Sequence, residues 1–94
     1  VEVVSVLLLD SRVDPAAGDN FGVRWASANG HTEVVRILLR DPRVDPTAVN
    51  NYAVFWATIN GHAETVRLLV QDPRVDATRA IEKASRRVLP VLIE

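Results

Sequence analysis

Apolar residues along the chain recur at helical spacing in blocks that end at glycine or proline. Residues 34–39, VVRILL, form an apolar stripe that predicts an amphipathic helix. Asp41-Pro42 follows and must stop that helix, because proline lacks an N–H and disfavours helical geometry in the residue before it. Tyr52 to Asn60 shows the same helical spacing, and Gly61 after it predicts a left-handed C-terminal cap.

The blocks return at a fixed interval of thirty-one residues. DSRVDP at 10–15 returns as DPRVDP at 41–46 and as DPRVDA at 72–77, while NFGVRWASANGH at 20–31 returns as NYAVFWATINGH at 51–62. Each unit predicts a short helix, a glycine turn, a longer helix, and an Asp-Pro turn with a short extended piece. Helices this short cannot bury their apolar faces alone, so we expect an all-α solenoid of stacked antiparallel helix pairs.

The chain divides along this repeat into one domain, 1–94. We assign a partial repeat to 1–15, repeats to 16–46 and 47–77, and an irregular C-terminal repeat or cap to 78–94. The expected helices cover 1–10, then pairs over about 20–41 and 51–72. In the last segment the Gly-His pair is missing and Pro90 interrupts what would be the second helix. The chain has no Met and opens within a helical pattern, so we expect it to be part of a longer reading frame.

The repeated residues resemble the ankyrin repeat. The resemblance is carried by ASANGHTEVVRILL at 26–39 and ATINGHAETVRLLV at 57–70, and it covers about nine-tenths of the chain. It implies an ankyrin-type solenoid that binds a partner protein on its concave face. Two features depart from the family. The Thr-Pro-Leu-His opening is replaced at 21–24 and 52–55, so its hydrogen bonds are absent, and the shortened Asp-Pro-Arg-Val-Asp turn argues against a full β-hairpin.

Composition and charge narrow the function classes. The formal charge is −1, from eleven basic and twelve acidic residues spread along the chain, so we expect neither nucleic acid nor a membrane surface as a partner. There is no cysteine, which removes thiolate chemistry and disulfides and favours an intracellular, cytoplasmic setting. No apolar stretch approaches the ~20 residues needed to cross a bilayer.

Repetition separates scaffold residues from catalytic ones, because a catalytic group is needed once. His31 and His62 occupy equivalent positions, so we expect each to bond a neighbouring backbone rather than a metal. The Asp pairs are equally repeated and are expected to accept local backbone N–H bonds in the turns; these pairs are Asp10 with Asp14, Asp41 with Asp45, and Asp72 with Asp76. We therefore predict a protein that is not an enzyme, with no catalytic residue, metal or cofactor site.

Two further sets of repeated residues have structural interpretations. Arg12, Arg43 and Arg74 lie in the turns beside aspartates, which favours local solvated ion pairs over a basic ladder for a partner. Trp25 and Trp56 are equivalent positions on the first helices and are expected to be buried in a stacked ladder between units rather than to form a ligand cage.

Positions that differ between repeats, and loops beside the first helices, are where specificity can lie. The ankyrin resemblance maps the partner surface onto Asp19, Asn20, Arg24, Ala28, Asn29, Asn50, Asn51, Phe55, Ile59 and Asn60. Phe55 and Ile59, one turn apart, form a candidate apolar anchor. Alternatively, Phe55 packs on the next unit.

Three alternatives stay open at this point. The chain could be a structural spacer in a longer array, with no partner of its own. Self-association through exposed terminal repeats, such as the apolar stripe in 1–9, would support that alternative. In the last segment Arg79, Glu82, Lys83, Arg86 and Arg87 could face water as a terminal cap, or the four basic residues among them could bind an acidic partner.

Overall fold

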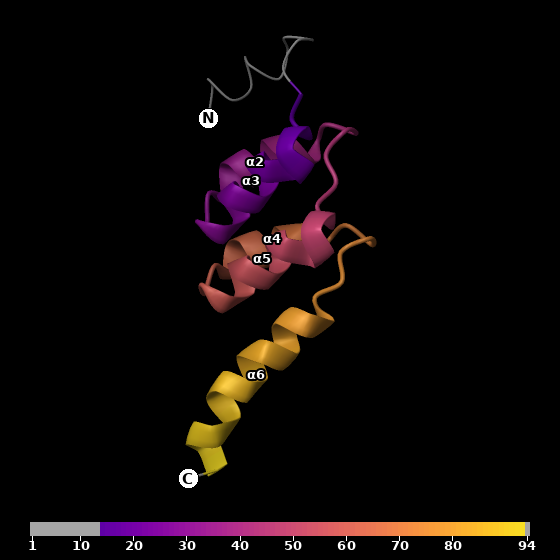
Figure 1. Ribbon diagram of the computed structural model, residues 1–94. Coiled ribbons are helices and arrows are strands. Elements are labelled where there is room, and N and C mark those ends of the chain that lie inside the picture. Colours follow the sequence, from indigo (N-terminus) through magenta and orange to yellow (C-terminus); the bar gives the residue numbers. More distant parts are fainter. Residues whose placement is uncertain (1–13, 94) are drawn as a thin grey trace.

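The fold is a stack of helices that runs along one axis (Figure 1). The computed structural model describes residues 14–93, with side chains described over 14–85. The helices are α2 (Ala17–Ala28), α3 (Thr32–Leu39), α4 (Ala48–Ile59), α5 (Ala63–Leu69) and α6 (Thr78–Ile93). The prediction of an all-α repeat solenoid is confirmed. The helix expected over 1–10 lies outside the described residues.

A glycine turn joins the two helices of each pair. Gly30 and Gly61 have φ of 72° and 78°, the left-handed conformation predicted for a C-terminal cap. After α2, the His31 N–H donates to the Ala26 carbonyl at 2.9 Å and the Gly30 N–H donates to the Ser27 carbonyl at 3.2 Å. These two bonds form a Schellman motif, which reverses the chain so that α3 returns antiparallel to α2.

The core lies between the pairs and is built from small and medium apolar side chains. On α2 the buried residues include Val23 and Ala26, three positions apart, and on α4 Val54 and Ala57 repeat that spacing. The second helices add Val35, Leu38 and Leu69, and Val44 joins from the turn. Because alanine takes little room, α2 and α4 pack closely, and more extensively than α3 packs on α5.

The second helix of each pair is not the longer one, which corrects the sequence prediction. α3 has 8 residues and α5 has 7, against 12 in each first helix. The first helices gain length at their start, where three successive residues adopt left-handed dihedral angles. These residues are Gly18, Asp19 and Asn20 in α2, and Val49, Asn50 and Asn51 in α4. Glycine and asparagine tolerate this conformation, whereas Val49 at φ 57° is β-branched and strained.

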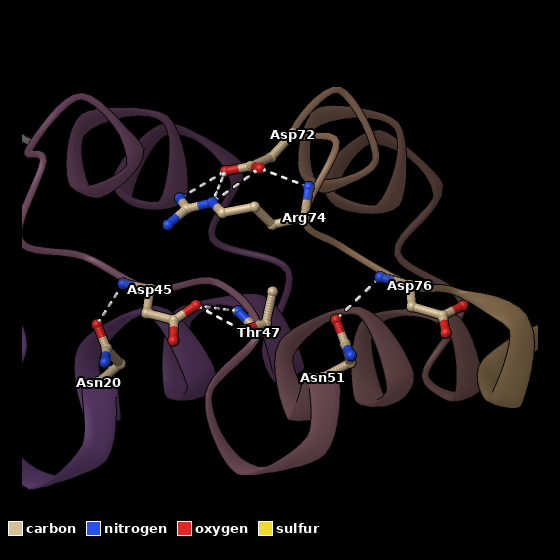
Figure 2. Close-up of polar contacts among 7 residues, drawn as sticks. All are labelled: Asn20, Asp45, Thr47, Asn51, Asp72, Arg74 and Asp76. Atoms are coloured by element: carbon tan, nitrogen blue, oxygen red, sulfur yellow. Dashed lines mark hydrogen bonds and ion pairs between the residues drawn. The ribbon is translucent and has the colours of Figure 1, made fainter.

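Asparagine side chains link each first helix to the turn that leads into the next pair. The Asp45 N–H donates to Asn20 Oδ1 at 2.7 Å, and the Asp76 N–H donates to Asn51 Oδ1 at 3.0 Å (Figure 2). Each bond spans twenty-five positions in sequence. The same polar contact therefore recurs at successive joints of the solenoid.

Aspartates order the turns, as the sequence predicted. Asp41 Oδ1 accepts the Arg43 N–H at 3.0 Å, and Asp72 Oδ1 accepts the Arg74 N–H at 2.9 Å. Asp14, Asp45 and Asp76 likewise accept an N–H from the second residue after them. The local arginine pairs are also confirmed, since Arg43 and Arg74 each approach the Asp two residues before them to 2.7 Å. Asp10 and Arg12 lie outside the described residues.

The last described element is one continuous helix. α6 runs from Thr78 to Ile93, so the interruption expected at Pro90 is wrong. Proline removes one backbone hydrogen bond and can bend a helix without ending it when the turns on either side hold. α6 packs on α4, and within residues 14–93 it has no antiparallel partner (Figure 1).

Candidate functional site

The predicted partner residues divide between internal bonding and solvent. Asn20 is 8% exposed and Asn51 is half-buried, and both side chains accept the inter-unit hydrogen bonds described above. Asn29 Nδ2 donates to the Trp25 carbonyl at 2.9 Å, and Asn60 Nδ2 donates to the Ala28 carbonyl of the preceding unit, also at 2.9 Å. These four amides therefore contribute to the scaffold, although Asn29 and Asn60 are exposed as well.

Arg24 is fixed in place by both polar and aromatic contacts. Its Nε donates to the Asp19 carbonyl at 3.0 Å, and one terminal nitrogen donates to the Gly18 carbonyl at 2.9 Å. The guanidinium carbon lies 5.7 Å from the Phe21 ring centroid and 5.1 Å from that of Tyr52. The cation thus lies against rings from two consecutive first helices, at distances typical of cation–π contacts.

The candidate anchor at Phe55 and Ile59 is only half-exposed. The Phe55 ring packs edge-on to Trp56 at 5.3 Å, and the Arg79 guanidinium of α6 lies 4.2 Å from the Phe55 ring centroid. Phe55 therefore does pack on the next unit, which was the alternative interpretation of this residue. Ile59 is half-buried, Ala28 is half-buried, and Asp19 and Asn50 are exposed.

The tryptophans lie at the surface rather than in the core. Trp25 is 50% exposed and Trp56 is 37% exposed, so the expected buried ladder is wrong. Trp25 instead stacks on the His31 ring at 4.9 Å, and Trp56 contacts Tyr52 at 6.1 Å. We call Phe21, Trp25, Tyr52 and Trp56 the aromatic face, because these residues occupy equivalent positions on α2 and α4.

The sequence held a signal for this exposure. On α2 the positions 23, 26 and 27 are buried, and they define the core side of the helix. At 100° per residue, Phe21 and Trp25 fall on another side, one turn apart from each other. The same spacing places Tyr52 and Trp56 away from the buried Val54 and Ala57. The aromatic character of these positions favours burial, whereas their position around the helix indicates exposure.

The histidines do not make the expected backbone bonds. No hydrogen bond from either imidazole is formed among the described residues. The His31 ring stacks on Trp25, and the His62 ring packs so close to Gly30 that a Cβ there would lie 2.5 Å from Nδ1. The two rings therefore act through packing. Thr32 and Thr65, which follow in the second helices, share a hydroxyl hydrogen bond of 2.8 Å between units.

Carboxyl groups in the turns have lowered pKa values for local reasons. The Thr47 hydroxyl donates to Asp45 Oδ1 at 2.6 Å and, with the Thr47 N–H, holds the pKa of that carboxyl below its usual value of 3.8. The Arg74 guanidinium lowers the pKa of Asp72 in the same manner. Within residues 14–93 no three histidine, cysteine or acidic side chains are grouped so that they could hold a metal ion. The lowered pKa values of these carboxyls therefore result from hydrogen bonds within the turns.

No helix in the described part of the chain is long and apolar enough to cross a membrane.

Comparison with known proteins agrees with the repeat architecture. Neither the curated proteins nor the solved structures contain a significant match to this chain. A family model described as ankyrin repeats, in three copies, matches residues 1–86. That match covers most of the chain, and the described residues fold into the stacked helix pairs of a repeat solenoid, so the chain belongs to the ankyrin repeat family.

Proposed function

We propose that this chain binds a partner protein through its layer of first helices, with the aromatic face as the central contact. The observation that carries this proposal is the exposure of Phe21, Trp25 and Trp56, at 57%, 50% and 37%. Adjacent exposed apolar side chains are costly to leave in water and commonly mark interaction sites. Tryptophan and tyrosine are also the residues that most often dominate the binding energy of protein interfaces.

Rigid placement of these rings supports a binding role. Arg24 bridges Phe21 and Tyr52 while its nitrogens bond the start of α2, so the two first helices hold the rings in a fixed relation. A preformed surface loses little conformational entropy on binding. The close packing of α2 on α4, compared with α3 on α5, supports the first helices as the concave side of the array.

Exposed polar residues at the edges of this layer complete the proposed interface. Asp19 and Asn50 lie at the start of the first helices, and Asn29 and Asn60 lie at their ends, all exposed. A polar rim around an apolar centre is the usual anatomy of a protein interface. Ankyrin repeats are generally protein-interaction modules and are typically non-enzymatic, which supports a binding function over a catalytic one.

The test is affinity capture from an extract of the organism that makes this protein, with three baits. The wild-type chain is compared with Trp25→Ser/Trp56→Ser and with Val70→Ser, a control that removes a 45% exposed apolar side chain beyond the end of α5. Urea midpoints of all three establish that the baits are folded. We expect a protein that is retained by the wild type and by Val70→Ser and lost from the double variant.

The same retained proteins on all three baits would refute the aromatic face as the contact. Capture of nothing by any bait would favour the structural spacer instead. Fluorescence gives an independent readout, because Trp25 and Trp56 are the two tryptophans of the sequence. Their emission should shift to shorter wavelength when a purified partner covers the aromatic face.

A further inference from the structure

A second surface feature lies on the layer of second helices, away from the aromatic face. It is an open groove of about 650 Å³ between α3, α5 and the turn that follows α5. Leu39, Leu68 and Pro73 supply its apolar lining, and Arg36, Arg40 and Arg74 supply its charge. The groove lies along α3 and α5, which pack on each other less extensively than α2 and α4 do.

The charge of the groove is predominantly positive. Its lining contains three guanidiniums and one carboxylate, Asp72, and that carboxylate pairs with Arg74 at 2.7 Å (Figure 2). Arg36 makes only a long contact, 3.4 Å to Glu33, between two exposed side chains. Such an exposed pair is weak and exchanges readily for a better partner.

No ion pair among the described residues compensates the charge of Arg40. The Arg40 side chain is exposed, and among the side chains described, those of residues 14–85, it has no ion-pair or hydrogen-bond partner. The equivalent position of the next repeat is Gln71, which also lines the groove, so the repeat scaffold does not require a cation there. A charge that the fold does not use, beside an apolar floor, is suited to an external ligand.

We propose that this groove binds an acidic peptide segment of a partner protein. Carboxylates of the segment pair with Arg40 and Arg36, since a guanidinium can donate two parallel hydrogen bonds to one carboxylate. An apolar side chain between those carboxylates packs on Leu39, Leu68 and Pro73. The excess of guanidiniums over carboxylates in the lining selects an acidic segment rather than a basic one. This site is independent of the aromatic face.

Fluorescence anisotropy with a labelled peptide, in which glutamates flank a pair of leucines, tests the proposal. We expect saturable binding that weakens at high salt and is lost when the glutamates are replaced by glutamines. Arg40→Gln should weaken binding roughly tenfold, since it removes a charge-assisted hydrogen-bond pair. The substitution installs the residue that the next repeat carries, so the fold should tolerate it.

Arg67→Gln is the matched control. Arg67 is the repeat equivalent of Arg36 and pairs with Glu64, but it lies outside the groove. The Arg67→Gln variant should bind the acidic peptide as the wild type does. The Trp25→Ser/Trp56→Ser variant should also bind it normally, which separates this test from that of the proposed function. Equal weakening by Arg40→Gln and Arg67→Gln would overturn the proposal, as would undiminished binding of the glutamine peptide. Binding of a single-stranded oligonucleotide in preference to the acidic peptide would also overturn it.

Discussion

Replacing Asn20 by alanine should lower the free energy of unfolding by about 2–4 kcal/mol, because two contributions are lost together. Asn20 Oδ1 accepts the Asp45 N–H at 2.7 Å in a part-buried position. Leaving such a donor without a partner costs about 1–3 kcal/mol. Alanine also tolerates the φ of 62° at this position less well than asparagine does, which adds about 1 kcal/mol.

Asn50 provides the matched control for this change. It has the same side chain and a similar φ of 56°, but it is exposed and its amide forms no hydrogen bond among the described residues. Asn50→Ala should therefore cost only about 1 kcal/mol, from the backbone conformation alone. A second pair, Asn20→Gly and Asn50→Gly, removes the conformational contribution, because glycine adopts positive φ freely. In that pair only the variant at position 20 should be destabilised.

Urea unfolding followed by far-ultraviolet circular dichroism measures both differences. The four variants and the wild type should unfold with similar slopes, so shifts of the midpoint report stability directly. An equal loss of unfolding free energy in Asn20→Ala and Asn50→Ala would refute the proposed role of the Asn20 hydrogen bond. That result would mean that the Asn20 amide does not stabilise the contact between α2 and the turn before α4.

Two other predictions concern the turns. Gly30→Ala should destabilise the fold by at least ~1 kcal/mol more than Gly61→Ala. Both glycines have positive φ, but a Cβ at position 30 would meet the His62 ring, whereas a Cβ at position 61 would meet nothing within 4 Å. Equal urea midpoints for the two variants would contradict this prediction. The Arg43 guanidinium lowers the pKa of Asp41 from 3.8 in the unfolded chain to about 2 in the folded protein. The ionised Asp41 carboxylate therefore stabilises the fold fully at pH values above 3.8, and this stabilisation is lost as the pH falls to about 2. The urea midpoints of wild type and Asp41→Asn should therefore converge between pH values of about 5 and 2, and a gap that stays constant would refute the assignment.

Features set by a few neighbouring residues could be predicted from the sequence. A glycine at the end of an apolar helical stripe predicts the left-handed cap at Gly30, and that cap forms with both Schellman bonds. An aspartate followed by a proline predicts a side-chain-bonded turn, and Asp41 and Asp72 form it. The caps and turns depend on local chain geometry, so the same structure forms in each repeat that carries the same residues.

Features that depend on contacts between units were harder to predict. The role of Asn20 requires the backbone of a turn twenty-five positions away, and nothing in its own segment indicates that distance. The left-handed start of α4 includes Val49, a β-branched residue that disfavours such a conformation, so local propensity points the wrong way there. The polar contacts that join repeats therefore emerged only from the structure.

Repetition also proved an incomplete guide to function. A residue that recurs in each unit was expected to serve the scaffold, yet Trp25 and Trp56 recur and are exposed. Beside them the repeats differ, since Arg24 in one unit corresponds to Phe55 in the next. A surface built in this way combines constant rings, which can contribute to any partner, with variable neighbours that distinguish one partner from another.

The groove on the second helices follows the same arrangement. Arg36 and Arg74 have repeat equivalents in Arg67 and Arg43, whereas Arg40 is replaced by Gln71. On both proposed surfaces a substitution at a constant position should weaken every ligand of that surface. A substitution at a variable position should instead change the order in which different ligands bind, because it alters a contact that only some of them make.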